Sequence, residues 1–122
     1  MTGMLQMRMM VLIGMLLLAM AKPALAHAIL VESTPAIGAT IASGPEAMQL
    51  RFNSRIDRAR SKLTLIRADK TTTPLSIAPE GSDDLLLTHL DLSAGTYSIR
   101  WQVLAIDGHI TRGDVPFTVE AK

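Results

Sequence analysis

Three residues near opposite ends of the chain carry groups that bind transition metals. Cleavage after Ala26 would make His27 the first residue, with a free α-amine and an imidazole that can close one chelate ring. The segment Asp107-Gly108-His109 adds a carboxylate and a second imidazole, two residues apart. If the fold brings the two ends together, these groups form an N/N/N/O set, which suits Cu(II).

Residues 1–26 have the three parts of a cleavable signal peptide. One positive charge, Arg8, comes first, the uninterrupted apolar run Met9 to Met20 follows, and Ala24-Leu25-Ala26 provides an A-x-A cleavage site. The apolar run is shorter than the roughly 20 residues that span a bilayer, which argues against an uncleaved anchor. A single Arg and an unbroken apolar core argue against a mitochondrial presequence. We therefore predict a periplasmic protein with one domain, residues 27–122.

The mature chain would be a small domain of different composition from its precursor. Removing residues 1–26 leaves 96 residues, enough for one hydrophobic core. Arg8 and Lys22 are lost with the leader, so the net charge changes from +1 to −1, which gives no reason to expect nucleic acid or an anionic membrane as partner. The chain has no cysteine for a disulfide or a lipid anchor. Met48 is the one methionine left, and we predict that it lies in the core.

Short alternating segments separated by turn residues predict an all-β fold. The clearest is Tyr97, Ile99, Trp101 and Val103, four apolar residues at a spacing of two. About seven such strands favour a sandwich or Greek-key barrel. The predicted strands are residues 28–31, 48–52, 63–65, 75–77, 85–87, 97–103 and 115–119, with a loop at 35–45 and a polar turn at 69–74.

Two interpretations of Asp107-Gly108-His109 remain open. If the preceding strand continues past Ala105, Asp107 and His109 leave it on one side, about 6.5–7 Å apart, and Gly108 lets the backbone bend toward one ion. The alternative is a tight turn, because Asp-Gly is a common hairpin signal and Asp often accepts a hydrogen bond from its own backbone. His27 contributes its amine only if cleavage falls after Ala26. Both nitrogens of His27 must be deprotonated to bind, so metal affinity should fall below neutral pH.

The mature chain contains an ordered set of short motifs: His27-Ala28, Ser33-x-Pro35-Ala36-x-Gly38-Ala39, Leu50-x-Phe52, Gly95-x-Tyr97-x-Ile99-x-Trp101 and Asp107-Gly108-His109-x-x-x-Gly113-x-x-x-Phe117. Together these motifs resemble the CopC family of periplasmic copper-resistance proteins. The resemblance implies a seven-stranded Greek-key β-barrel of cupredoxin/immunoglobulin-like shape. It also implies one Cu(II) site made by His27, through amine and imidazole, with Asp107 and His109. A CopD-type inner-membrane copper transporter is the implied partner.

Some members of that family also have a methionine-rich Cu(I) site, from which this chain departs because Met48 stands alone. We therefore expect a binder of Cu(II) only. His89 could approach the site as an extra ligand, but we predict a surface histidine. The other conspicuous side chains are predicted to be structural, with Trp101 and Tyr97 in the core and Arg55, Arg58 and Arg60 in a solvated loop with Asp57.

These observations predict a monomeric exported carrier that holds one Cu(II) for resistance, sequestration or delivery, and not an enzyme. One alternative is a copper-dependent polysaccharide monooxygenase, which also uses an N-terminal histidine. An anionic Asp107 would disfavour that chemistry by stabilising Cu(II) against reduction. The other alternative is a metal-free immunoglobulin-like interaction module. Ni(II) and Zn(II) remain possible occupants, although Cu(II) stands highest in the divalent affinity order.

Overall fold

The computed structural model describes residues 27–122, so the predicted signal peptide and its cleavage site lie outside the described residues. Within that range there is no helix, and none that could cross a membrane. The chain forms eight strands: β1 (Leu30–Thr34), β2 (Thr40–Ala42), β3 (Gly44–Phe52), β4 (Ile56–Arg67), β5 (Thr72–Leu75), β6 (Leu85–Leu92), β7 (Gly95–Ala105) and β8 (Ile110–Glu120).

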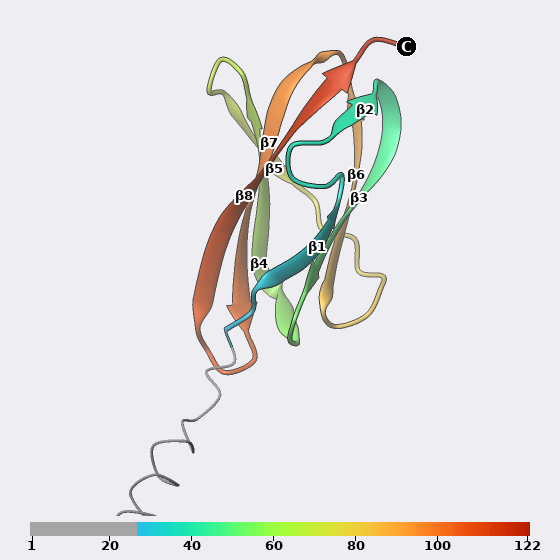
Figure 1. The fold of residues 1–122 in the computed structure, drawn as a ribbon. Helices are drawn as coiled ribbons and strands as arrows, with labels where there is room; N and C mark the ends of the chain where they lie inside the picture. The colour runs from blue at the N-terminus through green and yellow to red at the C-terminus, as the bar shows by residue number, and fades with distance from the viewer. Residues whose placement is uncertain (1–26) are drawn as a thin grey trace, which may run out of the picture.

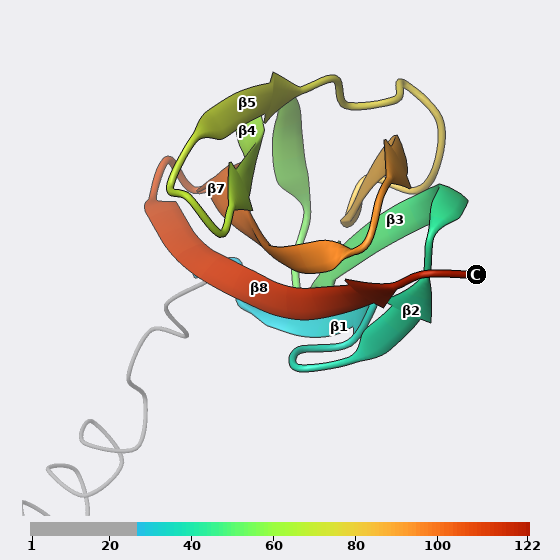
Figure 2. The ribbon, with the colours of Figure 1, turned by 90° about the horizontal axis from the view of Figure 1, so that it is seen from above.

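The strands form two sheets that pack as a sandwich (Figure 1). One sheet has the order β1-β3-β6, and the other has the order β2-β8-β7-β4-β5. All pairs are antiparallel except β2 with β8, which lie side by side at the edge of the second sheet (Figure 2). The predicted all-β sandwich is confirmed, with eight strands in place of seven.

Alternation along the strands places the core between the sheets. Most residues that face inward on β3, β7 and β8 are almost completely buried, while their neighbours are exposed on β3 and β8 and exposed or half-buried on β7. This alternation is expected for sheets with one face in contact with solvent. Trp101 packs edge-on against Phe52 with ring centroids 5.2 Å apart, and Met48 is fully buried, so both predictions of core positions are confirmed. Tyr97 is half-buried, stacks on Phe117 and donates its hydroxyl to the carbonyl of Ser93.

Several predicted loops are strands, for identifiable reasons. The loop predicted at 35–45 contains β2 and the start of β3, because a three-residue strand between glycines and prolines has too little sequence to show alternation. The turn predicted at 69–74 overlaps β5, and Ile77 lies outside any strand. β4 is much longer than the predicted strand at 63–65. The sequence pattern missed its first half because pairing with β7 is irregular between Asp57 and Lys62, which disrupts the two-residue period there.

Asp57, Arg58 and Arg60 lie on β4, so the solvated loop predicted for them was wrong. The Arg58 side chain packs against a neighbouring loop. Its guanidinium donates to four carbonyl oxygens, those of Pro79 at 2.9 Å, Ser82 at 2.8 Å, and Gly81 and Leu85 at 3.3 Å each. Three of these acceptors belong to the connection from β5 to β6, and the fourth, Leu85, is the first residue of β6. One planar cation with several N–H groups thus fixes a loop that has little secondary structure of its own.

Arg58→Met will lower the free energy of unfolding by about 1–3 kcal/mol, because the aliphatic stem is kept while four carbonyl oxygens lose a charged donor. The measurement is urea unfolding followed by Trp101 fluorescence. Arg60→Met is the matched control: Arg60 is also on β4, but its side chain is 76% exposed and lies 3.8 Å from Asp57, so we expect a change within about 0.5 kcal/mol. Equal stabilities for the two variants would contradict the role given to Arg58.

Candidate metal site

The fold brings His27 and His109 together at one end of the sandwich. The first residues that the structure describes lie beside the turn between β7 and β8, at the end of the sandwich opposite the C-terminus (Figure 1). The two imidazole rings lie edge to face, with centroids 4.9 Å apart and planes at 80°. Residues 82 positions apart in the sequence therefore present two nitrogen ligands within reach of one ion.

Asp107, Gly108 and His109 form the tight turn of the β7–β8 hairpin, which confirms the turn interpretation. β7 ends at Ala105, so the other interpretation, a strand that continues to His109, does not hold. The Asp107 side chain accepts the backbone N–H of His109 at 3.0 Å, and Gly108 takes φ of +89°, a conformation that glycine adopts without strain. The turn closes the hairpin and also points His109 toward His27.

Asp107 contacts His109 through its side chain as well. One carboxylate oxygen accepts the backbone N–H, and the other lies 3.0 Å from Nδ1 of the imidazole. The backbone hydrogen bond is the main cause that holds the pKa of Asp107 below its ordinary value; the His109 side chain lowers it further, and partial burial opposes both. Asp107 is thus an ionised acceptor beside the two imidazoles.

His27 has a buried nitrogen without a partner. Its Nδ1 atom is shielded from solvent and forms no hydrogen bond, although buried polar atoms are nearly always paired. Nδ1 is the nitrogen that can close a small chelate ring with the α-amine of the same residue. The donor chemistry of the site therefore fits a metal ion.

The candidate site is not complete while residue 26 is joined to His27. Among residues 27–122, no three His, Asp or Glu side chains are grouped as a ready metal site. Both oxygens of Asp107 face His109, and the nitrogen of His27 is still in the peptide bond to Ala26. Completion needs the free amine that cleavage would supply and a rotation of the Asp107 carboxylate toward the ion.

Two residues that fix the N-terminal segment were missed by the sequence analysis. Thr111 donates its hydroxyl to the carbonyl of Ala28 at 2.6 Å. Asn53 accepts the N–H of Ile29 at 2.8 Å through its side chain and donates its own N–H to the Ile29 carbonyl at 2.9 Å. The one sequence signal for Thr111 is its position two residues after His109, and no signal identified Asn53.

His89 lies away from the two imidazoles. It is exposed on β6 opposite Ala47, whereas the part of β6 that lies toward His27 is Leu85, which pairs with Arg51. Four residues separate His89 from Leu85, about 13 Å along a strand. The structure therefore places it on the surface, as predicted.

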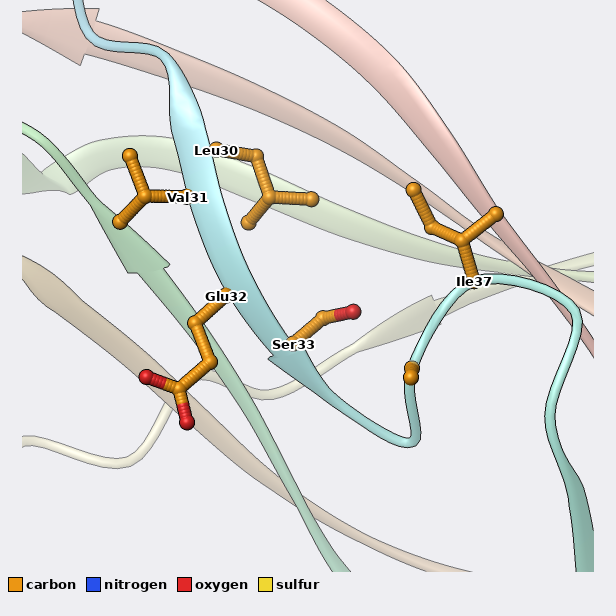
Figure 3. Close-up of a pocket in the computed structure, with 6 residues that line it drawn as sticks. Leu30, Val31, Glu32, Ser33 and Ile37 are labelled. Atoms are coloured by element: carbon orange, nitrogen blue, oxygen red, sulfur yellow. The ribbon is translucent and has the colours of Figure 1, made fainter.

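A shallow groove along β1 is separate from the metal site. Its lining includes Leu30 and Ser33, on the side of β1 that faces Ile37, whereas the side chains of Val31 and Glu32 point away from Ile37 (Figure 3). The groove is lined mainly by aliphatic side chains and contains none of the three predicted ligands. Five large aliphatic side chains are exposed in the described chain, all in segments that follow His27 or flank the hairpin turn: Ile29, Val31, Ile37, Ile106 and Ile110.

Comparison with known proteins gives a consistent result. Residues 30–120 match the model of the CopC domain. Copper resistance protein C of Escherichia coli is 30% identical over 120 residues, which cover 90% of this chain and 94% of that protein. The crystal structure of CopC from Methylosinus trichosporium OB3b superposes with a TM-score of 0.71 at 26% identity, covering 78% of this chain and 95% of that one. PcoC from Escherichia coli, a methionine-rich copper resistance protein, gives a TM-score of 0.67 at 27% identity, covering 78% and 100%.

Proposed function

Because this chain belongs to the CopC family, we propose that it is an exported copper carrier that holds one Cu(II) between its mature N-terminus and the β7–β8 turn. The observation that carries the proposal is the pair of imidazoles 4.9 Å apart, one of which has a buried, unpartnered Nδ1. Copper is cargo in this proposal, and the protein performs no reaction on it. The biological role of the protein is copper resistance, copper sequestration or delivery of copper to a CopD-type transporter in the inner membrane.

The proposed ligands are the α-amine and Nδ1 of His27, one nitrogen of His109 and a carboxylate oxygen of Asp107. Three nitrogens and one anionic oxygen in a tetragonal arrangement favour Cu(II) over Zn(II) and Ni(II). The negative charge of Asp107 favours the divalent over the monovalent ion. The hairpin turn and the segment that leads into β1 supply these groups, and both are joined directly to paired strands, so that few parts of the site must be ordered on binding.

The position of Met48 supports a site for Cu(II) only. Thioether sulfur is the ligand type that selects Cu(I), and a thioether site needs accessible methionines. Met48 is fully buried on β3, and the mature chain has no other methionine. In this respect the chain differs from PcoC, whose crystal structure is described as that of a methionine-rich protein.

A Cu(II) titration tests the proposal directly. The exported protein is purified, its mass is used to verify that it begins at His27, and copper is added while the EPR spectrum is recorded. We expect saturation at one equivalent and an axial, nitrogen-rich spectrum. Absence of specific binding would reject the carrier and leave a metal-free interaction module as the better description.

Asp107→Ala will weaken Cu(II) binding by about 10- to 100-fold while the sandwich stays folded, because a ligand and orienting carboxylate is lost from an exposed turn. Competition with a chelator measures the affinity, and urea unfolding checks the fold. Asp69→Ala is the matched control. Asp69 bonds Thr71 through the same backbone and side-chain pattern, in the β4–β5 turn, and its pKa is likewise lowered, chiefly by the Thr71 hydroxyl. If both variants bound copper like the parent, Asp107 would have no place in the site.

A further inference from the structure

The chain termini of most domains are poorly ordered unless something ties them down. Here the two residues after His27 are held from both sheets. We propose that Thr111 and Asn53 form an N-terminal clamp that positions His27 for copper; this inference rests on the proposed function. The clamp consists of these two side chains and the backbone of Ala28 and Ile29.

The first half of the clamp comes from the five-stranded sheet. Thr111 follows His109 by two residues on β8, is half-buried, and donates its hydroxyl to the carbonyl of Ala28 at 2.6 Å. Ala28 is itself fully buried, so its carbonyl carbon and the adjoining Cα have little room to move. The strand that begins directly after His109 thus fixes Ala28, the residue bonded to His27.

The second half of the clamp comes from the three-stranded sheet. Leu30 pairs with Phe52, and Asn53 extends this pairing by one residue beyond the end of β3. Its backbone N–H donates to the Ile29 carbonyl at 2.9 Å, and its side-chain oxygen accepts the Ile29 N–H at 2.8 Å. Both backbone polar groups of Ile29 are thus hydrogen-bonded to Asn53. With Ala28 held by Thr111, the backbone is fixed up to the residue next to His27, and His27 alone is free to rotate.

The clamp explains how a terminal residue can act as a preorganised ligand. A frayed terminus would lose backbone freedom on binding copper, and that loss would be subtracted from the affinity. With Ala28 and Ile29 already fixed, only the bonds of His27 itself remain to be ordered. Thr111 and Asn53 touch neither the imidazole of His27 nor the metal in this account, so they are positioning residues and not ligands.

The test compares Thr111→Val with the parent, both beginning at His27. Valine keeps the shape and removes the donor, so we expect Cu(II) affinity to fall about tenfold, the lower end of the range for residues that orient metal ligands. At saturating copper the EPR spectrum should match that of the parent, because the ligands are unchanged. Thr111→Ser keeps the hydroxyl and should restore most of the affinity. Hydrogen exchange at the Ile29 amide of the metal-free protein should be faster in Thr111→Val than in the parent.

Thr88→Val is the matched control. Thr88 donates its hydroxyl to the carbonyl of Ser76 at 2.7 Å and is almost fully buried, but it lies on β6, away from His27. This variant should lose stability and keep the copper affinity of the parent. The clamp is overturned if Thr111→Val binds as tightly as the parent, or if Thr88→Val weakens binding equally. A parent protein that binds no copper overturns the proposed function instead, and this failure appears without any variant.

Discussion

A mature protein extended by one alanine ahead of His27 will bind Cu(II) about a hundredfold to ten-thousandfold more weakly than the native form. The extension turns the α-amine into an amide, which is a poor copper ligand, and it places the new amine beyond the ring that Nδ1 of His27 can close. Joining two donors on one residue makes the second binding step intramolecular, and gains of this size are typical of such linkage. Competition titration and EPR measure the loss, since the spectrum should also change as one nitrogen is replaced.

One alanine added after Lys122 is the control for the extension. It lengthens the chain equally, at the end of the sandwich opposite the site. We expect this variant to bind copper like the native protein. Equal binding by the two extended proteins would reject the chelating terminus, and the site would then have to be built from the two imidazoles and Asp107 without the α-amine.

Gly113→Ala will destabilise the sandwich by about 1–3 kcal/mol, the usual cost of inserting a methyl group into a packed core. Gly113 pairs with Trp101 across β7 and β8, and the indole lies over it. A Cβ on Gly113 would come within 2.4 Å of Trp101 Cζ2. The indole cannot easily yield because its other side packs on Phe52. Urea unfolding followed by tryptophan fluorescence measures the change, and a shifted emission in the native state would report a displaced Trp101.

Gly95→Ala separates this steric effect from the general effect of replacing a strand glycine. Gly95 lies at the start of β7, and an added Cβ there would meet the Tyr97 ring at 3.4 Å, an ordinary contact. We expect its stability to stay within about 0.5 kcal/mol of the parent or to rise slightly, as the unfolded chain loses freedom. A Gly113→Ala protein as stable as Gly95→Ala would mean that the indole can shift without cost.

The parts of the fold that alternation predicted are those whose pairing is regular. β7 and β8 pair without interruption, and their inward positions Ile99, Trp101 and Phe117 are buried as the two-residue period indicates. β4 was recognised only at its regular end, because the irregular pairing after Asp57 shifts which side chains face inward. The role of Arg58 depends on carbonyl groups more than 20 residues away, and no local pattern records such a partner.

The sequence predicted that His27 and His109 lie close together, because their donor types and positions suggested one metal, and the fold brings their rings together. It left open how Asp107 and His109 are arranged. A continuing strand would have separated the two residues by its two-residue rise, whereas the turn places their side chains in contact at 3.0 Å. Strand and turn were both compatible with Asp-Gly, and the choice depends on where β7 stops pairing with β4, at Ala105.

The two imidazoles belong to opposite halves of the sandwich. His27 leads into β1 of the three-stranded sheet, and His109 lies in the hairpin of the five-stranded sheet. An ion held by both would act as a removable cross-link at the seam between the halves, at the end where the chain enters. Because such a ligand binds the folded state only, resistance to heat and to proteolysis would rise with free copper, and the protein would last longest when copper is abundant.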